Sequence, residues 1–166
     1  MAMALFGVVF PAIAASETRV FIIPEDSNQE FGAIPAGEYG LMEWYCNEPG
    51  CDCRRVMIHV VARRGMAHVA SINHAFDPPA PDAPGGITVR TFLDPLNKQT
   101  KFSNDILRLC TELVLSDDAY CQRLVRHYKM FKEVVNNPKH PRRHVLFPGA
   151  VGPAERKRPK RPPFRG

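Results

Sequence analysis

The chain has 166 residues, of which 45% are hydrophobic and 23% are charged. This length suits one folded domain with a tail and excludes a large multidomain enzyme. No run of about eighteen or more apolar residues occurs, so a membrane-spanning helix is not expected. Five cysteines are an odd number, and three of them lie between residues 46 and 53. This usage indicates a reducing compartment, and we expect a cytoplasmic protein.

The N-terminus carries an apolar stretch, Leu5 to Ala15, that ends in small residues like a secretory cleavage site. A secretory signal also needs a positive segment ahead of its apolar core, yet no Lys or Arg precedes Arg19. We therefore predict a flexible N-terminus over residues 1–16, with a strand or a cleaved signal as the alternatives.

Short segments rich in β-branched and aromatic residues follow, separated by Pro- and Gly-marked turns. Their apolar residues tend to alternate along the chain, which is typical of strands in a sheet. The expected strands are residues 18–23, 38–46, 54–62, 66–76 and 87–92. Such short connections favour an antiparallel β-meander.

From Ser103 onward the apolar residues recur at helical spacing, which predicts a helix of about three turns. A second amphipathic helix is predicted after the cap at residues 116–118, ending at residues 136–138. His127, on this helix, is interpreted as a surface or boundary residue. Strands followed by helices indicate an α+β fold, with the body over residues 17–136.

Residues 137–166 contain nine Lys and Arg against Glu155 alone, a net charge of +8, and seven of the sixteen prolines. This composition buries too little apolar surface to order the chain, so a disordered basic C-terminal arm is predicted. Such an arm suits phosphates, and RNA or the ribosome is the expected partner; the alternative is that it only keeps the protein soluble. The predicted nucleic-acid-binding residues are Arg156, Lys157, Arg158, Lys160, Arg161 and Arg165.

Cys46, Cys51 and Cys53 form the most informative segment of the chain. Three thiolates on one tight turn suit Zn²⁺, and the turn at residues 49–50 would bring Cys53 opposite Cys46. The following arginines, Arg54 and Arg55, are expected to lower the thiol pKa values. Free cysteines, or one disulfide with a spare thiol, are the alternatives.

A structural zinc site needs a fourth ligand. Pairing across the turn at residues 63–65 would set residue 54 opposite residue 74, which makes His74 the first choice. His59 and His68 rank below His74 because they lie further along the strands.

Zinc with three protein ligands and an open position could also serve an enzyme, and Cys53 could act as a nucleophile. However, the chain lacks the deaminase pattern, a Gly-rich phosphate loop, the hydrolase elbow and the metalloprotease helix motif. No catalytic residue is assigned. The sequence favours a zinc-stabilised interaction protein that binds nucleic acid or another protein; its oligomeric state does not follow from the sequence.

The segment Tyr45-Cys46-Asn47-Glu48-Pro49-Gly50-Cys51-Asp52-Cys53-Arg54-Arg55 resembles a group of uncharacterised bacterial proteins, some of which carry a SEC-C zinc motif. Residues 92–97 and 124–132 are similar to that group too, so the resemblance spans about residues 38–132. The resemblance implies a zinc-binding protein without an assigned reaction. The SEC-C pattern itself is absent, and the basic tail occupies its place.

Overall fold

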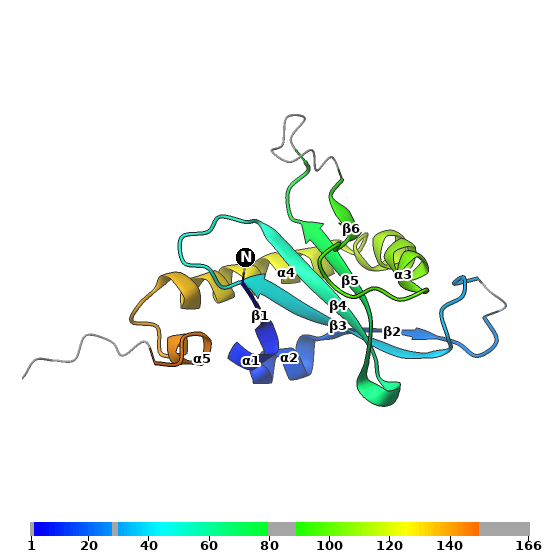
Figure 1. Cartoon of the computed structure of the whole chain (residues 1–166), viewed down its shortest axis with the longest axis horizontal. Helices are drawn as coiled ribbons and strands as arrows, with labels where there is room; N and C mark the ends of the chain where they lie inside the picture. The colour runs from blue at the N-terminus through cyan, green and yellow to red at the C-terminus, as the bar shows by residue number, and fades with distance from the viewer. Residues whose placement is uncertain (1, 28–29, 80–88, 150–166) are drawn as a thin grey trace, which may run out of the picture.

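The computed structural model describes residues 2–27, 30–79 and 89–149 and shows an antiparallel sheet with helices packed on it (Figure 1). This confirms the predicted α+β fold. The strands are β1 (Met3–Leu5), β2 (Arg19–Ile23), β3 (Gly37–Cys46), β4 (Arg55–Ala62), β5 (Ala67–Ala75) and β6 (Thr91–Leu93). The helical segments are α1 (Phe6–Val9), α2 (Pro11–Glu17), η1 (Arg64–Met66), α3 (Ser103–Leu109), η3 (Cys110–Val114), α4 (Asp118–Asn136) and α5 (Arg143–Leu146).

The centre of the sheet is the predicted meander, in which β3, β4, β5 and β6 are neighbours in that order. Two short strands pair with the edge of β3 that faces away from β4. β2 pairs with residues 37–41 of β3, and β1 pairs with residues 44–46. The predicted strands agree with β2 to β5 to within a residue or two. The predicted strand at 87–92 falls partly outside the described residues, and β6 begins at Thr91.

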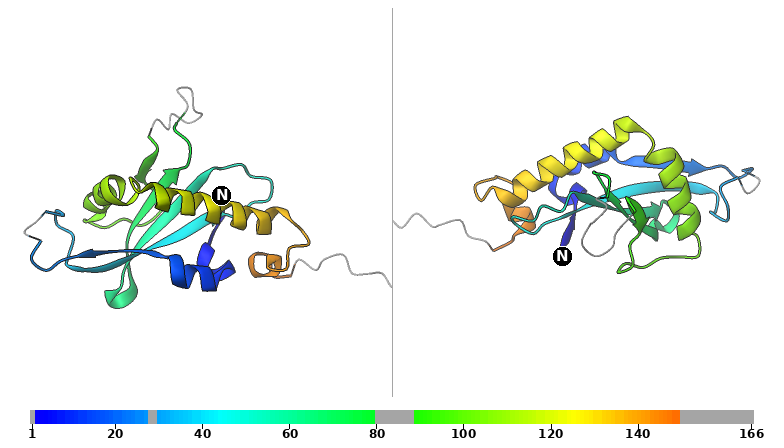
Figure 2. Two further views of the ribbon diagram at one scale, coloured as in Figure 1. Left: turned by 180° about the vertical axis from the view of Figure 1, so that it is seen from behind. Right: turned by 90° about the horizontal axis from the view of Figure 1, so that it is seen from above.

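Alternation along β3 divides the sheet into two faces. Tyr39, Leu41 and Tyr45 are buried on the face that carries the helices, whereas Met42 and Trp44 point to the other face and are half-buried. Figure 2 shows α3 and α4 lying on one side of the sheet. The fold therefore has two layers, with the core between the sheet and the helices.

The first predicted helix is present but changes character after two turns. α3 continues into η3, where Leu115 N–H donates to Cys110 O at 2.7 Å in the wider, π-type pattern. The second helix, α4, begins as predicted: Asp117 is its N-cap and accepts from the N–H groups of Ala119 and Tyr120. It runs for 19 residues and is long enough to cross the sheet.

The N-terminus differs from the flexible segment predicted for residues 1–16. β1 adds to the sheet, and Phe6, Val9 and Phe10 are buried in the core. Phe6 stacks on His127 with ring centroids 4.2 Å apart. The apolar run that resembled a signal is thus used as core, because burial of its aromatic side chains outweighs the entropy of ordering the segment.

The first part of the predicted C-terminal arm also differs from the prediction. Residues 138–149 include α5, and Val145, Leu146 and Phe147 pack against the core. Arg142 lies over the Phe10 ring at 4.8 Å, so this segment also covers the N-terminal helices. Residues 150–166, with all six predicted nucleic-acid-binding residues, lie outside the described residues. No helix in the described ranges is long and apolar enough to span a membrane.

Candidate metal centre

The three clustered cysteines come together at one end of the sheet. Cys46 is the last residue of β3 and is fully buried, while Cys51 and Cys53 are half-buried in the connection to β4. The three Sγ atoms all lie within 4.8 Å of one another. Sheet pairing between β3 and β4 ends at Trp44 and Met57, so the predicted pairing of Cys46 with Cys53 does not form. The loop, not the sheet register, brings the thiols together.

Two features shape this loop. Gly50 has φ 74°, a left-handed conformation that glycine adopts without steric cost, and Cys51 N–H donates to Glu48 O. The end of α4 then holds the loop in place: Lys132 Nζ donates to Cys46 O at 3.4 Å, and Asn136 Oδ1 accepts from Gly50 N–H at 3.0 Å. The cysteine cluster is therefore attached to both layers of the fold.

The thiols differ in acidity. Hydrogen bonds from the backbone and side chain of Cys53 hold the pKa of Cys51 below its usual range, and the positive charge of Lys132 contributes less. Burial and the neighbouring thiols raise the pKa of Cys53 to about 12. The sequence predicted that Arg54 and Arg55 would lower these values, but Arg54 instead pairs with Asp77. Because metal binding must displace the Cys53 proton, metal affinity should fall with falling pH.

His74, the predicted fourth ligand, is not part of this group of ligand atoms. It lies opposite Val56 rather than residue 54, is 3% exposed, and its Nδ1 is 2.8 Å from Thr91 Oγ1. The register differs by two residues from the simple pairing across the β4–β5 turn. This turn contains η1, and the pairing shifts between Val60 and Val61. Among the described residues, the group contains only the three cysteines.

The other two histidines considered as ligands lie on the sheet face away from the helices. The His59 ring is 5.0 Å from those of both Trp44 and His68, and His68 Nε2 is 2.9 Å from Ser71 Oγ. Neither residue joins the cysteine group. Cys110 is buried in the core, and burial raises its pKa to about 12, which makes it an inert thiol.

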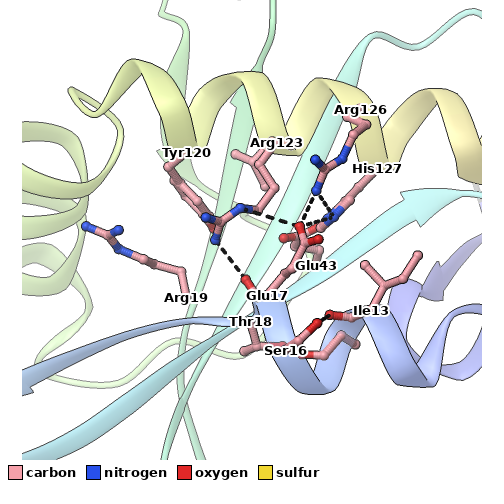
Figure 3. A network of polar contacts seen from close by, with 12 residues as sticks. Ile13, Ser16, Glu17, Thr18, Arg19, Glu43, Tyr120, Arg123, Arg126 and His127 are labelled. Atoms are coloured by element: carbon pink, nitrogen blue, oxygen red, sulfur yellow. Dashed lines mark hydrogen bonds and ion pairs between the residues drawn. The ribbon is translucent and has the colours of Figure 1, made fainter.

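A second polar cluster, centred on His127, was not recognised in the sequence. Figure 3 shows His127 of α4 between two carboxylates: its Nδ1 is 2.7 Å from Glu43 Oε2 and its Nε2 is 3.1 Å from Glu17 Oε2. Tyr45 Oη also donates to Glu43, and Arg126 pairs with Glu17. His127 is 1% exposed, so its interpretation as a surface or boundary residue was wrong.

The sequence contains one indication of this cluster, namely Glu43. In a strand, Glu43 lies on the same face as the apolar residues Leu41 and Tyr45, where a charged residue is unexpected. The adjoining cavity has a volume of about 20 Å³, room for about one water molecule. A substrate does not fit there. We interpret the cluster as a structural link that holds α2 against α4.

Comparison of the chain with models of protein families, with curated proteins and with solved structures finds no match. The resemblance to the bacterial group with the same cysteine segment therefore stays a prediction. The cysteine cluster itself is the feature that best indicates a function.

Proposed function

We propose that the protein is a zinc-stabilised interaction protein in which Cys46, Cys51 and Cys53 bind one Zn²⁺. The observation that carries this proposal is the approach of three Sγ atoms to within 4.8 Å. Thiolates are the ligands that zinc prefers in structural sites, and three of them around one point match most of a tetrahedral set. A water molecule or a ligand from a partner would complete it.

The surroundings favour a structural role for the metal. The loop that carries Cys51 and Cys53 is tied to α4 through Lys132 and Asn136, so a bound ion would connect β3, this loop and α4. The buried ammonium group of Lys132 also lies near the thiols and would partly offset the negative charge of three thiolates. Binding energy at such a point contributes directly to folding.

Elemental analysis of protein purified without a histidine tag or chelator tests the proposal. We expect about one zinc per chain. Cys53→Ser should abolish stoichiometric zinc and reduce the free energy of unfolding by clearly more than the ~1 kcal/mol typical of point mutations. Cys121→Ser is the matched control: Cys121 is also half-buried but lies outside the cysteine group, so both zinc content and stability should change little.

A thiol-dependent activity is the second candidate, supported by the lowered pKa of the half-buried Cys51. If the purified protein contains no metal and Cys51 alone reacts rapidly with iodoacetamide, this candidate replaces the zinc proposal. If zinc is bound and protects all three thiols from alkylation, the thiol-dependent activity is excluded.

We propose further that the basic C-terminal arm gives the protein its affinity for RNA, including ribosomal RNA. The support is the charge of residues 148–166, with six Lys and Arg against one Glu, because closely spaced Lys and Arg gain free energy by releasing counterions from phosphates. The body has no large excess of acidic residues that would oppose this: outside residues 137–166 the net charge is only −3.

A further inference from the structure

A cavity of about 240 Å³ lies beside the cysteine cluster on the sheet face away from the helices. Its apolar walls come from β1, β4, β6 and the segment after β6: Met3, Met57, Phe92 and Leu96. Cys53 borders it, but most of its lining belongs to the sheet. The volume lies just below the usual range of ligand pockets, about 300–1,000 Å³, and therefore suits a small molecule.

The main polar group of this cavity is the guanidinium of Arg55. Its Nε donates to Asn73 Oδ1 at 2.6 Å, and its Cζ lies 5.1 Å from the centre of the Phe92 ring. These two contacts fix the plane of the group. Its Nη2 is buried and has no hydrogen-bond partner among the described residues. A buried donor without an acceptor costs free energy, and more so when it is charged.

Arg55 also has no acidic partner: within the described ranges it forms no ion pair, in contrast to its neighbour Arg54, which pairs with Asp77. The guanidinium remains charged at all physiological pH values. The cavity thus contains a fixed cation for which the described residues supply neither a hydrogen-bond acceptor at Nη2 nor a direct counter-ion.

Asp94 is the one carboxylate among the described residues of the cavity wall, and it is not the counter-ion of Arg55. Its Oδ1 accepts from Leu96 N–H and Asn97 Nδ2, both at 2.9 Å, and its Oδ2 accepts from Asn73 Nδ2 at 3.3 Å. Asn73 therefore stands between Arg55 and Asp94 and bonds to both. The carboxylate already has three donors, and the unmatched group is the cation.

We propose that this cavity binds a small organic carboxylate, whose oxygens accept from the Arg55 guanidinium and whose apolar body packs against Met57 and Phe92. Arginine is well suited to this task, because its planar fork matches a carboxylate. The inference goes beyond the proposed function and does not require a bound metal. It adds a ligand site to a protein for which the sequence predicted only macromolecular partners.

The test on the unchanged protein uses fluorobenzoate and fluorobenzamide, observed by fluorine NMR at constant ionic strength. The two probes have the same ring and nearly the same shape, but only the first is an anion. We expect saturable binding of fluorobenzoate that is about tenfold or more tighter than that of fluorobenzamide. Equal affinities, or no saturation by fluorobenzoate up to about 10 mM, would overturn the proposal.

Two adjacent arginines provide a matched pair of variants. Arg55→Met keeps an unbranched, flexible side chain but is shorter and removes the charged guanidinium, and should weaken fluorobenzoate binding about tenfold or more while leaving fluorobenzamide nearly unchanged. Arg54→Met removes the same charge outside the cavity, and should leave both affinities within about twofold, a change below about 0.4 kcal/mol. If both variants lose fluorobenzoate binding equally, the effect is one of net charge and the cavity is not the site. The comparison of the two probes needs no variant, so it decides the matter even if Arg55→Met does not fold.

Discussion

Histidine side chains show most directly how burial changes a residue in this protein. His74 is 3% exposed between the sheet and the helices, and its ring makes a hydrogen bond with Thr91 Oγ1. Burial, together with the charges of Arg90 and Arg55, lowers the pKa of His74 to about 4. The residue predicted as a metal ligand is thus a neutral core residue.

The lowered pKa of His74 predicts a pH dependence of stability. In the unfolded chain the imidazole takes up a proton near pH 6.5, whereas the folded protein keeps it neutral down to about pH 4. The contribution of His74 to the free energy of unfolding should therefore be complete above pH 6.5. It should be lost as the pH drops towards 4, which lowers the free energy of unfolding by up to ~3 kcal/mol. Urea unfolding at several pH values measures the slope.

Variants identify the source of that slope. His74→Gln should flatten the dependence of unfolding free energy on pH, although His59 and His68, whose pKa values burial also lowers, will retain part of it. His144→Gln changes an exposed histidine of α5 and should keep the full slope. Identical slopes in both variants would show that His74 is not the group responsible.

At the scale of elements, α4 organises the molecule. Its buried residues face the sheet, its Leu124 carbonyl oxygen lies 3.1 Å from Tyr45 Oη, and its C-terminal half fixes the cysteine loop. Its N-terminus is linked to β2, because the N-cap Asp117 also pairs with Arg19 at 3.3 Å. A change at either end of α4 should therefore affect the sheet as well as the helix.

The N-cap provides the test. Asp117→Ala removes the acceptor of two backbone N–H groups and the partner of Arg19, and should lower the free energy of unfolding by about 1–2 kcal/mol. In a domain of this size, each kcal/mol lost from the free energy of unfolding should lower the thermal unfolding temperature by about 2–4 °C. Asp118→Ala is the control, because among the described residues Asp118 forms no ion pair and interacts favourably with the helix dipole, an effect of about 0.3–1 kcal/mol. A larger effect at Asp118 would contradict the assignment of Asp117 as the cap.

The whole molecule divides its charge between two regions. Residues 148–166 contain six Lys and Arg and one Glu, a net charge of +5, while residues 1–147 are neutral overall. Among the residues that the structure describes, Phe147 is the last that packs against the core, which makes it a natural point for truncation. The fold should survive the loss of residues 148–166.

Truncation after Phe147 tests the proposed role of the arm. The truncated protein should keep its thermal unfolding temperature but lose retention on RNA at low salt. If all six basic residues of 148–166 contact phosphates, the slope of the logarithm of the RNA-binding constant against the logarithm of the salt concentration should decrease in magnitude by about 4 on truncation. A full-length variant with these six residues changed to Gln should behave like the truncated protein. Unchanged retention in either variant would refute the RNA-binding role.

Local patterns in the sequence were enough to predict most elements of this protein. The alternation in residues 38–46 and 54–62 and the helical stripe after Asp117 depend on interactions along the chain, so β3, β4 and α4 could be placed from sequence. The cysteine cluster was also visible, because Cys46, Cys51 and Cys53 are so close in the chain that a single loop can bring them together.

The tertiary structure alone decided which residues far apart in the chain meet. His74 pairs with Val56 rather than with residue 54 because of the turn at η1 together with the register shift between Val60 and Val61, and both are settled only when the two strands pair. His127 meets Glu17 and Glu43 across 110 and 84 residues. The apolar N-terminus is part of the core because a sheet edge and a helix face are available to bury it. The favourable free energy of burying this apolar surface arises only once the other elements have assembled.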